Sequence, residues 1–192
     1  MINIQLEELL RDNLDKFTLS ESFGQRSVGD LIESRVCSII QQTYPDKFIP
    51  ASSNRSVEDL ALSDNRLMLF DVKTHSINPN GFSMPNLISI DRLRKTLSND
   101  NTDLSYIFVS YKRDKSSLIV EDVKIKYIWE LDWEMLAIQS LGKGQLQITN
   151  ANNEKLYTDI GRDMWLKILK IKAIEFYNRR LEKINKYKNS WK

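Results

Sequence analysis

Residues 55–75, RSVEDLALSDNRLMLFDVKTH, carry the pattern that decides the fold, because acidic positions precede an apolar run that ends in Asp-Val-Lys. If residues 67–74 form a strand, successive side chains alternate between its two faces. Asp71 and Lys73 then share one face, while Val72 lies on the other. A carboxylate and an ammonium group are therefore predicted to stand side by side on this strand.

Residues 57–62 also have the composition of a short strand, and residues 63–66 have that of a turn. The two apolar segments are therefore predicted to pair as a hairpin. This pairing brings Asp59, or its neighbour Glu58 on the opposite face, across from Asp71. Two carboxylates then converge on one point of the predicted sheet.

Convergent carboxylates offer oxygen ligands to a hard cation, and Mg²⁺ typically binds through one or two carboxylates together with a substrate phosphate. A lysine beside such a site can orient a water molecule, or ease its deprotonation, for attack on that phosphate. The pattern therefore points to phosphodiester hydrolysis. Asp59 and Asp71 are the candidate metal ligands, and Lys73 is the candidate group that acts on the water.

In these residues the sequence resembles the PD-(D/E)XK nuclease superfamily, and within it the type II restriction endonucleases. The family pattern is an acidic residue, a spacer and then Asp/Glu-X-Lys, which Asp59, Asp71 and Lys73 match. The family's proline before the first acid is absent, since Val57-Glu58 occupies that place, and Glu58 stays an alternative first ligand.

The resemblance implies a Mg²⁺-dependent endonuclease that cuts double-stranded DNA at a specific sequence and leaves 5′-phosphate ends. It implies that the carbonyl of Val72 helps Asp59 and Asp71 to hold the metal. It also implies a homodimer whose two-fold axis matches a palindromic site. Many members carry an acidic residue on the helix before the catalytic hairpin, and Glu33 is the candidate for this accessory catalytic role.

Length and composition bound the architecture. At 192 residues, 41% of them hydrophobic, the chain can bury one sizeable core and is predicted to be a single domain. We divide it into N-terminal helices (1–45), the catalytic hairpin and sheet (47–150) and a basic amphipathic helix (162–188).

The chain has one cysteine and one histidine, which excludes sites that need two or more of either residue. Cys37 is the only cysteine and His75 the only histidine, so an intrachain disulfide, a zinc finger and a multi-histidine metal site are excluded. Neither a secretory signal nor an apolar run of about 18 residues is visible, so a cytoplasmic protein without membrane contact is expected.

Two helices are predicted before the hairpin. The first spans residues 2–17, and the second begins at Ser27 as N-cap and ends near Tyr44-Pro45. Glu33 lies at the border of the apolar face of the second helix. It can serve the hairpin, or it can pair with a nearby arginine such as Arg35 or Arg26.

The rest of the chain predicts a layered α/β fold. Residues 47–50 are predicted to form a connection, 86–89 to lead into a helix through Leu97, and 106–111 to form a central buried strand. After a turn at 112–116, residues 117–120 and 123–129 are predicted to continue the sheet. Asp132 can cap a short helix through Ile138. The expected class is α/β: one domain with a central mixed β-sheet flanked by helices, as in restriction endonucleases.

Polar residues near the hairpin are candidates for contact with double-stranded DNA. They lie in the loop after residue 74, on the helix that follows it, and on the strand 145–148, where two glutamines share a face. Amide side chains can read adenine edges, and arginines can grip phosphates. An ordinary polar loop and the wet face of an edge strand explain the same residues. The candidates are His75, Asn78, Asn80, Ser83, Asn86, Arg92, Gln145 and Gln147.

The C-terminal residues 162–192 contain ten Lys and Arg against three Asp and Glu. Helical spacing of apolar residues predicts that a stripe of this helix packs on the body, and the charges lie mostly outside the stripe. Contact with phosphate is one explanation of those charges and solvation is the default. The stripe comprises Met164, Ile168, Ile171, Ile174, Leu181 and Ile184.

Two other functions fit the same residues. A structure-selective nuclease for DNA repair or junction resolution would keep the hairpin and its metal. A non-catalytic, basic α/β DNA-binding module would keep the charges, with the Asp and Lys of the hairpin merely paired to each other. Binding to DNA without divalent metal, and no cut under any condition, is the behaviour expected of that module alone.

Overall fold

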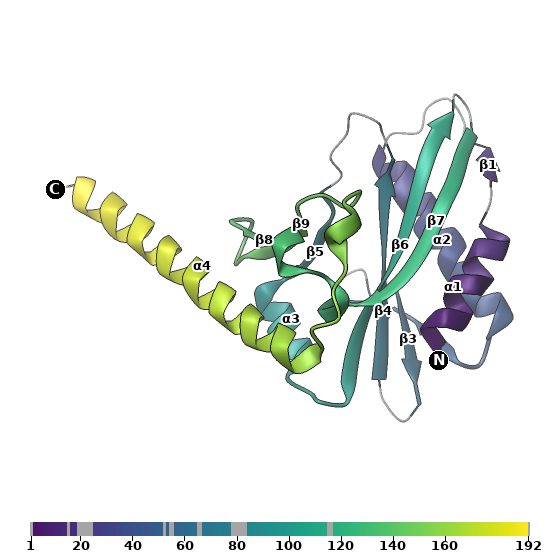
Figure 1. Cartoon of the computed structure of the whole chain (residues 1–192), viewed down its shortest axis with the longest axis horizontal. Coiled ribbons are helices and arrows are strands. Elements are labelled where there is room, and N and C mark those ends of the chain that lie inside the picture. The colour runs from purple at the N-terminus through teal and green to yellow at the C-terminus, as the bar shows by residue number, and fades with distance from the viewer. Residues whose placement is uncertain are drawn as a thin grey trace.

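The computed structural model describes residues 2–14, 16–18, 25–51, 53, 56–64, 67–77, 84–114 and 117–191. Its frame is a six-stranded sheet in the order β1-β7-β6-β4-β3-β2, beside which stands a three-stranded sheet in the order β5-β9-β8 (Figure 1). The helices are α1 (Ile2–Asn13), α2 (Gln25–Thr43), α3 (Ile90–Leu97) and α4 (Arg162–Ser190). The strands are β1 (Lys16–Thr18), β2 (Phe48–Pro50), β3 (Leu60–Ser63), β4 (Leu67–Ser76), β5 (Asn86–Ser89), β6 (Thr102–Asp114), β7 (Ser117–Tyr127), β8 (Leu136–Gln139) and β9 (Gln145–Ile148).

The large sheet is mixed, as the sequence predicted. β4 and β6 run parallel, with α3 in the connection between them, and the other neighbours in this sheet are antiparallel. The predicted central strand is confirmed in β6, which is buried from Thr102 to Tyr111. A strand covered on both faces needs apolar residues on both, which explains its nearly continuous apolar run.

Helices and the small sheet cover the two faces of the large sheet. Phe70 and Val72 of β4 pack with α1 and α2 on one face, whereas Leu69 packs with α3, the small sheet and the start of α4 on the other (Figure 1). Side chains alternate across a strand, so β4 contributes to both cores. The predicted class, a central mixed sheet flanked by helices, is confirmed.

The ends of several predicted elements were wrong. The first helix ends at Asn13 rather than residue 17, and Phe17 instead pairs with Leu118 in the edge strand β1. The second helix begins at Gln25, before the predicted cap Ser27. Edge strands of three residues carry too few side chains to show a period of two, which is why both β1 and β2 (48–50) escaped the sequence reading.

Two further predictions, both in segments that contain a short strand, differ from the structure. The strand predicted over 57–62 begins only at Leu60. The helix predicted through Ile138 is a single 3₁₀ turn, Trp133–Met135, capped by Asp132 as expected and followed at once by β8. In the second place a short apolar run fits either period, and pairing of β8 with β9 decided the outcome.

The C-terminal helix was predicted correctly but packs differently. Its buried residues are Trp165, Leu169 and Phe176, whereas Ile174 and Leu181 of the predicted stripe are 51% and 56% exposed. In the half that packs on the body, α4 buries another face, so that Met164 and Ile171 are 49% and 56% exposed. With 29 residues, the helix also extends beyond the body (Figure 1). None of the described helices is long and apolar enough to cross a membrane.

Candidate active site

The predicted pair on β4 is present. The Nζ of Lys73 lies 2.5 Å from Oδ2 of Asp71, and both side chains are largely buried. Alternation along β4 places them on the face shared with Tyr106, the register partner of Asp71 on β6. The Lys73 ammonium also stands 5.9 Å from the centre of the Tyr106 ring. The strand thus holds one carboxylate and one ammonium group next to the ring of Tyr106.

Asp59 joins this pair because β3 stops one residue short of it. The last register pair is Leu60 with Phe70, after which the N–H of Asp59 donates to the carbonyl of Phe70. Its Oδ2 then accepts the N–H of Val72 at 2.7 Å. A side-chain oxygen therefore takes the place of a main-chain partner, which holds the carboxylate against β4 one strand away from Asp71.

Helix α2 brings a third acid to the same edge. Gly29 lets the helix approach β4, since a Cβ there would lie 3.3 Å from Oγ1 of Thr74. One turn later Glu33 is half-buried, and its pKa is raised by burial first and then by the charge of Asp59, while Lys73 lowers it. Glu33 is thus within electrostatic reach of the hairpin.

Cys37, which sequence reasoning did not single out as a neighbour of the hairpin, lies one turn beyond Glu33. Its pKa is raised to about 12, by burial first and then by the charges of Asp59 and Glu33. The spacing of four residues on one helix was the signal that could have found it. With this pKa it is a neutral thiol at physiological pH.

Negative charge exceeds positive charge at the site. Burial raises the pKa of Asp71 to about 7, Lys73 lowers it, and the charges of Asp59 and Glu33 raise it. Beneath it the buried hydroxyl of Tyr106 has no hydrogen-bond partner among the described residues, and its pKa is raised well above the usual value, first by burial and then by Asp71. One ammonium therefore does not compensate the gathered carboxylates.

This donor set fits Mg²⁺. Oxygen ligands from one or two carboxylates, completed by waters and a substrate phosphate, are the way in which proteins usually hold this ion. Within the described part of the chain, no group of three or more His, Cys, Asp or Glu side chains is placed to hold a metal, so the fit rests on Asp59 and Asp71. Burial and the neighbouring carboxylates raise the pKa of Asp71 although Lys73 lies beside it, so additional positive charge would stabilise the ionised carboxylate.

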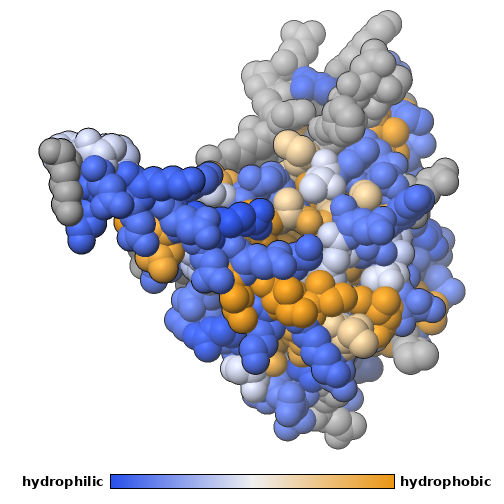
Figure 2. Space-filling view, turned by 60° about the vertical axis from the view of Figure 1, so that its left-hand side comes forward, coloured by the Kyte–Doolittle hydropathy of each residue, from blue (hydrophilic) through white to orange (hydrophobic). Residues whose placement is uncertain are grey.

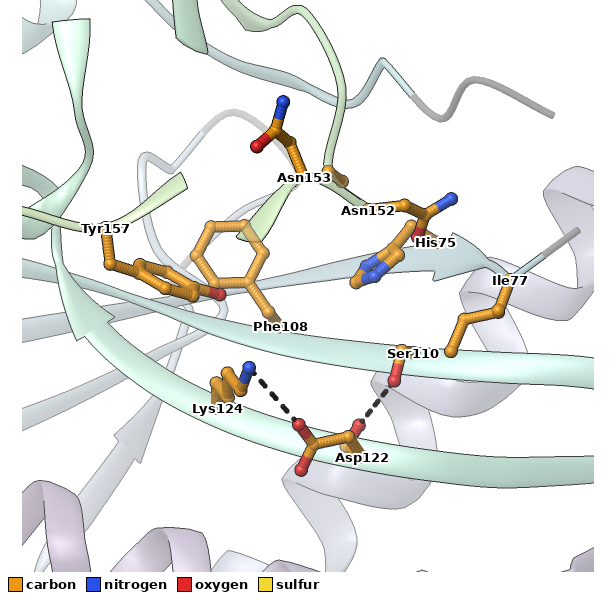
Figure 3. Close-up of a pocket in the computed structure, with 10 residues that line it drawn as sticks. His75, Ile77, Phe108, Ser110, Asp122, Lys124, Asn152, Asn153 and Tyr157 are labelled. Atoms are coloured by element: carbon orange, nitrogen blue, oxygen red, sulfur yellow. Dashed lines mark hydrogen bonds and ion pairs between the residues drawn. The ribbon is translucent and has the colours of Figure 1, made fainter. Parts of the chain in front are cut away.

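Beyond Lys73 the same face of β4 opens into a cavity of about 270 Å³. Figure 3 shows His75 of β4 at this cavity with Phe108 of β6, Tyr157 and the side chains of Asn152 and Asn153. Lys124 and Asp122 of β7 form an ion pair at its floor, 3.5 Å apart. The predicted residue His75 is thus found beside Lys73, in a cavity that the sequence reading missed because its wall comes from residues 151–157, far along the chain.

The imidazole of His75 is neutral in this cavity. Its pKa is lowered to about 4, by burial first and then by the charge of Lys124, against a smaller opposite effect of Asp122. Its Nδ1 is buried and has no hydrogen-bond partner among the residues that the structure describes. His75 can therefore offer hydrogen bonds but carries no charge for a phosphate at neutral pH.

Solved structures share this arrangement of strands and helices. No family model matches the sequence, and no curated protein matches it. Among solved structures, the NlaIV restriction endonuclease superposes with a TM-score of 0.56 over 83% of this chain and 70% of its own, at 15% sequence identity. The fold is restriction-endonuclease-like.

Within this restriction-endonuclease-like fold, the other predicted DNA contacts fall in three places. Asn78, Asn80 and Ser83 lie outside the described residues. Arg92 is exposed on α3. The remaining three are on the small sheet, where Asn86 pairs with Gln147 and Ser89 with Gln145.

The two glutamines share a face of β9, as predicted, because they alternate with buried Leu146 and Ile148. Nε2 of Gln147 donates to the carbonyl of Met84 at 3.0 Å, so its amide already has one partner. The structure thus contains an acidic cluster at β4 and a polar face on the small sheet, and contact of the latter with DNA stays a prediction.

Proposed function

We propose that the protein is a Mg²⁺-dependent, sequence-specific endonuclease of the type II restriction class within the PD-(D/E)XK superfamily, acting on double-stranded DNA. The observation that carries the proposal is the gathering of Asp59, Asp71 and Lys73 at one edge of β4. Its support is the restriction-endonuclease-like fold, shared with a solved restriction endonuclease.

The residues have distinct roles in this proposal. Asp59 and Asp71, with the main-chain carbonyl of Val72, would hold the ion. When bound, Mg²⁺ supplies the positive charge that binds and polarises the scissile phosphate. The hydrogen bond from the Val72 N–H fixes one oxygen of Asp59, which leaves its other oxygen to act as a ligand.

Lys73 acts on the attacking water. Its ammonium is held by Asp71, so its N–H donors have a defined place from which to orient a water molecule toward the phosphate. The water oxygen forms a bond to phosphorus while the water gives up a proton to Glu33, the bond from phosphorus to the 3′-oxygen breaks, and that oxygen takes a proton from solvent. The products carry a 5′-phosphate and a 3′-hydroxyl.

Glu33 assists by accepting a hydrogen bond from the same water. Its raised pKa, caused first by burial and then by Asp59, makes the carboxylate a better proton acceptor than an exposed glutamate. Each chain holds one such cluster and therefore cuts one strand, so we propose a homodimer for cleavage of both strands. Contacts from His75, Arg92 and the glutamines of β9 position the duplex.

Digestion of DNA of known, mixed sequence tests the proposal. With Mg²⁺ the protein should give discrete fragments, and sequencing of their ends should show one recurring site with 5′-phosphates. Asp71→Ala and Lys73→Ala should abolish cleavage while DNA binding persists. Their matched controls are Asp64→Ala and Lys112→Ala, which remove the same charges from exposed positions.

The other functions predict different results. Cleavage of branched or damaged DNA with intact plasmid untouched would identify a structure-selective nuclease instead. Binding that needs no divalent metal, with no cut on any substrate, would identify a DNA-binding module. Unchanged cleavage by Asp71→Ala would remove the assignment of the site itself.

A further inference from the structure

The outer half of α4 projects from the body without support. Every residue from Tyr177 to Trp191 is exposed. The last contacts with the body are hydrogen bonds from the hydroxyl of Tyr177 to the Lys143 carbonyl at 2.8 Å and from Nη1 of Arg180 to the Gly142 carbonyl at 2.6 Å. Figure 1 shows the helix extending well beyond them.

Large apolar side chains follow this projecting segment at regular spacing. From Ile174 the steps alternate between three and four residues, which is the spacing of a coiled-coil seam. Most of these side chains are more than half exposed, and Figure 2 shows apolar surface on the projecting helix and on the body beside it, next to charged surface. The positions of this seam are Ile174, Tyr177, Leu181, Ile184, Lys188 and Trp191.

The seam continues into a groove on the body. A cavity of about 560 Å³ lies between α3 and the first half of α4, and Ile174 and Tyr177 line it as well as beginning the seam. Its other walls are mainly apolar, such as Leu97 and Leu166. One apolar face therefore runs from the groove to the end of the helix, a form that suits a second helix.

We propose that this seam binds the α4 seam of a second copy of the chain, with the two helices antiparallel. In this register Ile174 meets Trp191 of the other copy, and Leu181 meets Ile184. Lys188, the one charged residue of the seam, then lies against the ring of Tyr177, where an ammonium is stabilised. A parallel pair would instead bury Lys188 against its own copy.

Charge and area agree with this occupant. Arg179, Lys183 and Lys186 fall at positions outside the seam, so antiparallel pairing leaves them in solvent. The five apolar side chains of the seam are exposed by 41% to 77% and offer about 100 Å² each, hence roughly 1,000 Å² over two copies. Lys188 adds to this area, which therefore meets the roughly 1,000 Å² that a specific interface needs. DNA would cover the lysines but not the leucine and isoleucine side chains.

Pairing would also stabilise the projecting helix itself. Most helical stability in proteins comes from packing of an apolar face, and the outer half of α4 has such a face exposed. An antiparallel pair is isologous and closes on itself, so it makes a dimer and not a fibre. The inference deepens the homodimer of the proposed function by naming the surface that joins the two copies. No residue of the β4 cluster takes part, so failure of the seam and failure of the nuclease assignment can be told apart.

Oligomeric mass by light scattering is the first test. The wild-type chain should be a dimer at micromolar concentration, and Leu181→Asp with Ile184→Asp should weaken association at least a hundredfold with an unchanged circular dichroism melting curve of the body. The matched control, Lys183→Asp with Lys186→Asp, places two aspartates outside the seam and should remain a dimer. A monomeric wild type at about 100 μM, or a dimer that survives the seam variant, would overturn the inference.

Disulfide cross-linking tests the direction of the pair and does not depend on the seam variant. Ile174→Cys mixed with Trp191→Cys should cross-link across the two copies, whereas Ile174→Cys alone should not, because an antiparallel pair separates its two cysteines by about 26 Å. The wild type, treated alike, controls for Cys37. Cross-linking of Ile174→Cys alone would show a parallel pair, and binding of a monomer to anionic lipid vesicles would show a membrane surface, and either contradicts the proposal.

Discussion

Replacement of Asp71 by Asn should make the protein more stable, although it should abolish the proposed activity. The pKa of Asp71 is raised from 3.8 to about 7, with burial as the first cause. The folded chain therefore binds a proton more tightly at this carboxyl than the unfolded chain does. Stability is lost as pH rises through this window, and an asparagine, which resembles the protonated acid in shape, avoids the loss.

The size of the effect follows from the same two values. One pKa unit corresponds to about 1.4 kcal/mol, so the advantage of Asp71→Asn should approach 4 kcal/mol above about pH 8 and fall below about 1 kcal/mol near pH 4. Unfolding in urea without divalent metal, at both pH values, measures the difference. Asp64→Asn, at an exposed position, is the matched control. An advantage that is absent at high pH, or equal at both pH values, would refute the electrostatic reasoning.

Three further predictions concern the metal, the helix α2 and the core. Saturating Mg²⁺ should raise the melting temperature of the wild type, by an amount equivalent to about 2.7 kcal/mol at a hundredfold excess over Kd, but not that of Asp59→Asn; equal shifts in calorimetry would exclude Asp59 as a ligand. Gly29→Leu should cost about 1 to 3 kcal/mol in urea unfolding and reduce cleavage, because a side chain there meets Thr74 and pushes Glu33 away, whereas Ser34→Leu, at an exposed position of the same helix, should do neither. Trp165→Ala should cost about 3 to 5 kcal/mol in urea unfolding, since the indole is fully buried and donates to the Leu131 carbonyl; a loss no larger than that of Ile4→Ala, an exposed position, would contradict this packing.

Predictions from the sequence were confirmed where apolar and polar residues repeat with a clear helical or strand spacing, or form an unbroken apolar run. The pairing of Asp71 with Lys73 followed from alternation along one strand, and β6 followed from an unbroken apolar run. Both depend on neighbours in the chain, which the residue order contains. The mixed sheet followed from the order of such elements.

The rest depends on contacts between distant residues. The cavity at His75 is closed by Asn152 and Tyr157, and its existence depends on how the segment 151–157, which follows the small sheet, lies against β6 and β7. The prediction of how α4 packs was wrong for a different reason. An apolar stripe on a helix predicts that other side chains bury it, but the pattern does not say whether those side chains belong to the same chain. Ile174 and Leu181 show the difference.

The turn at residues 142–144 joins the small sheet to the projecting helix. Gly144 has a φ of 102°, and a side chain there would meet the Phe176 ring at 2.9 Å, while the carbonyls of Gly142 and Lys143 hold α4. The same turn leads directly into β9 and its glutamines. The turn therefore fixes the position of β9 relative to α4. If two copies join through α4, this position determines the distance between the glutamines of the two copies. That distance is also the length of duplex that both pairs of glutamines could contact at once.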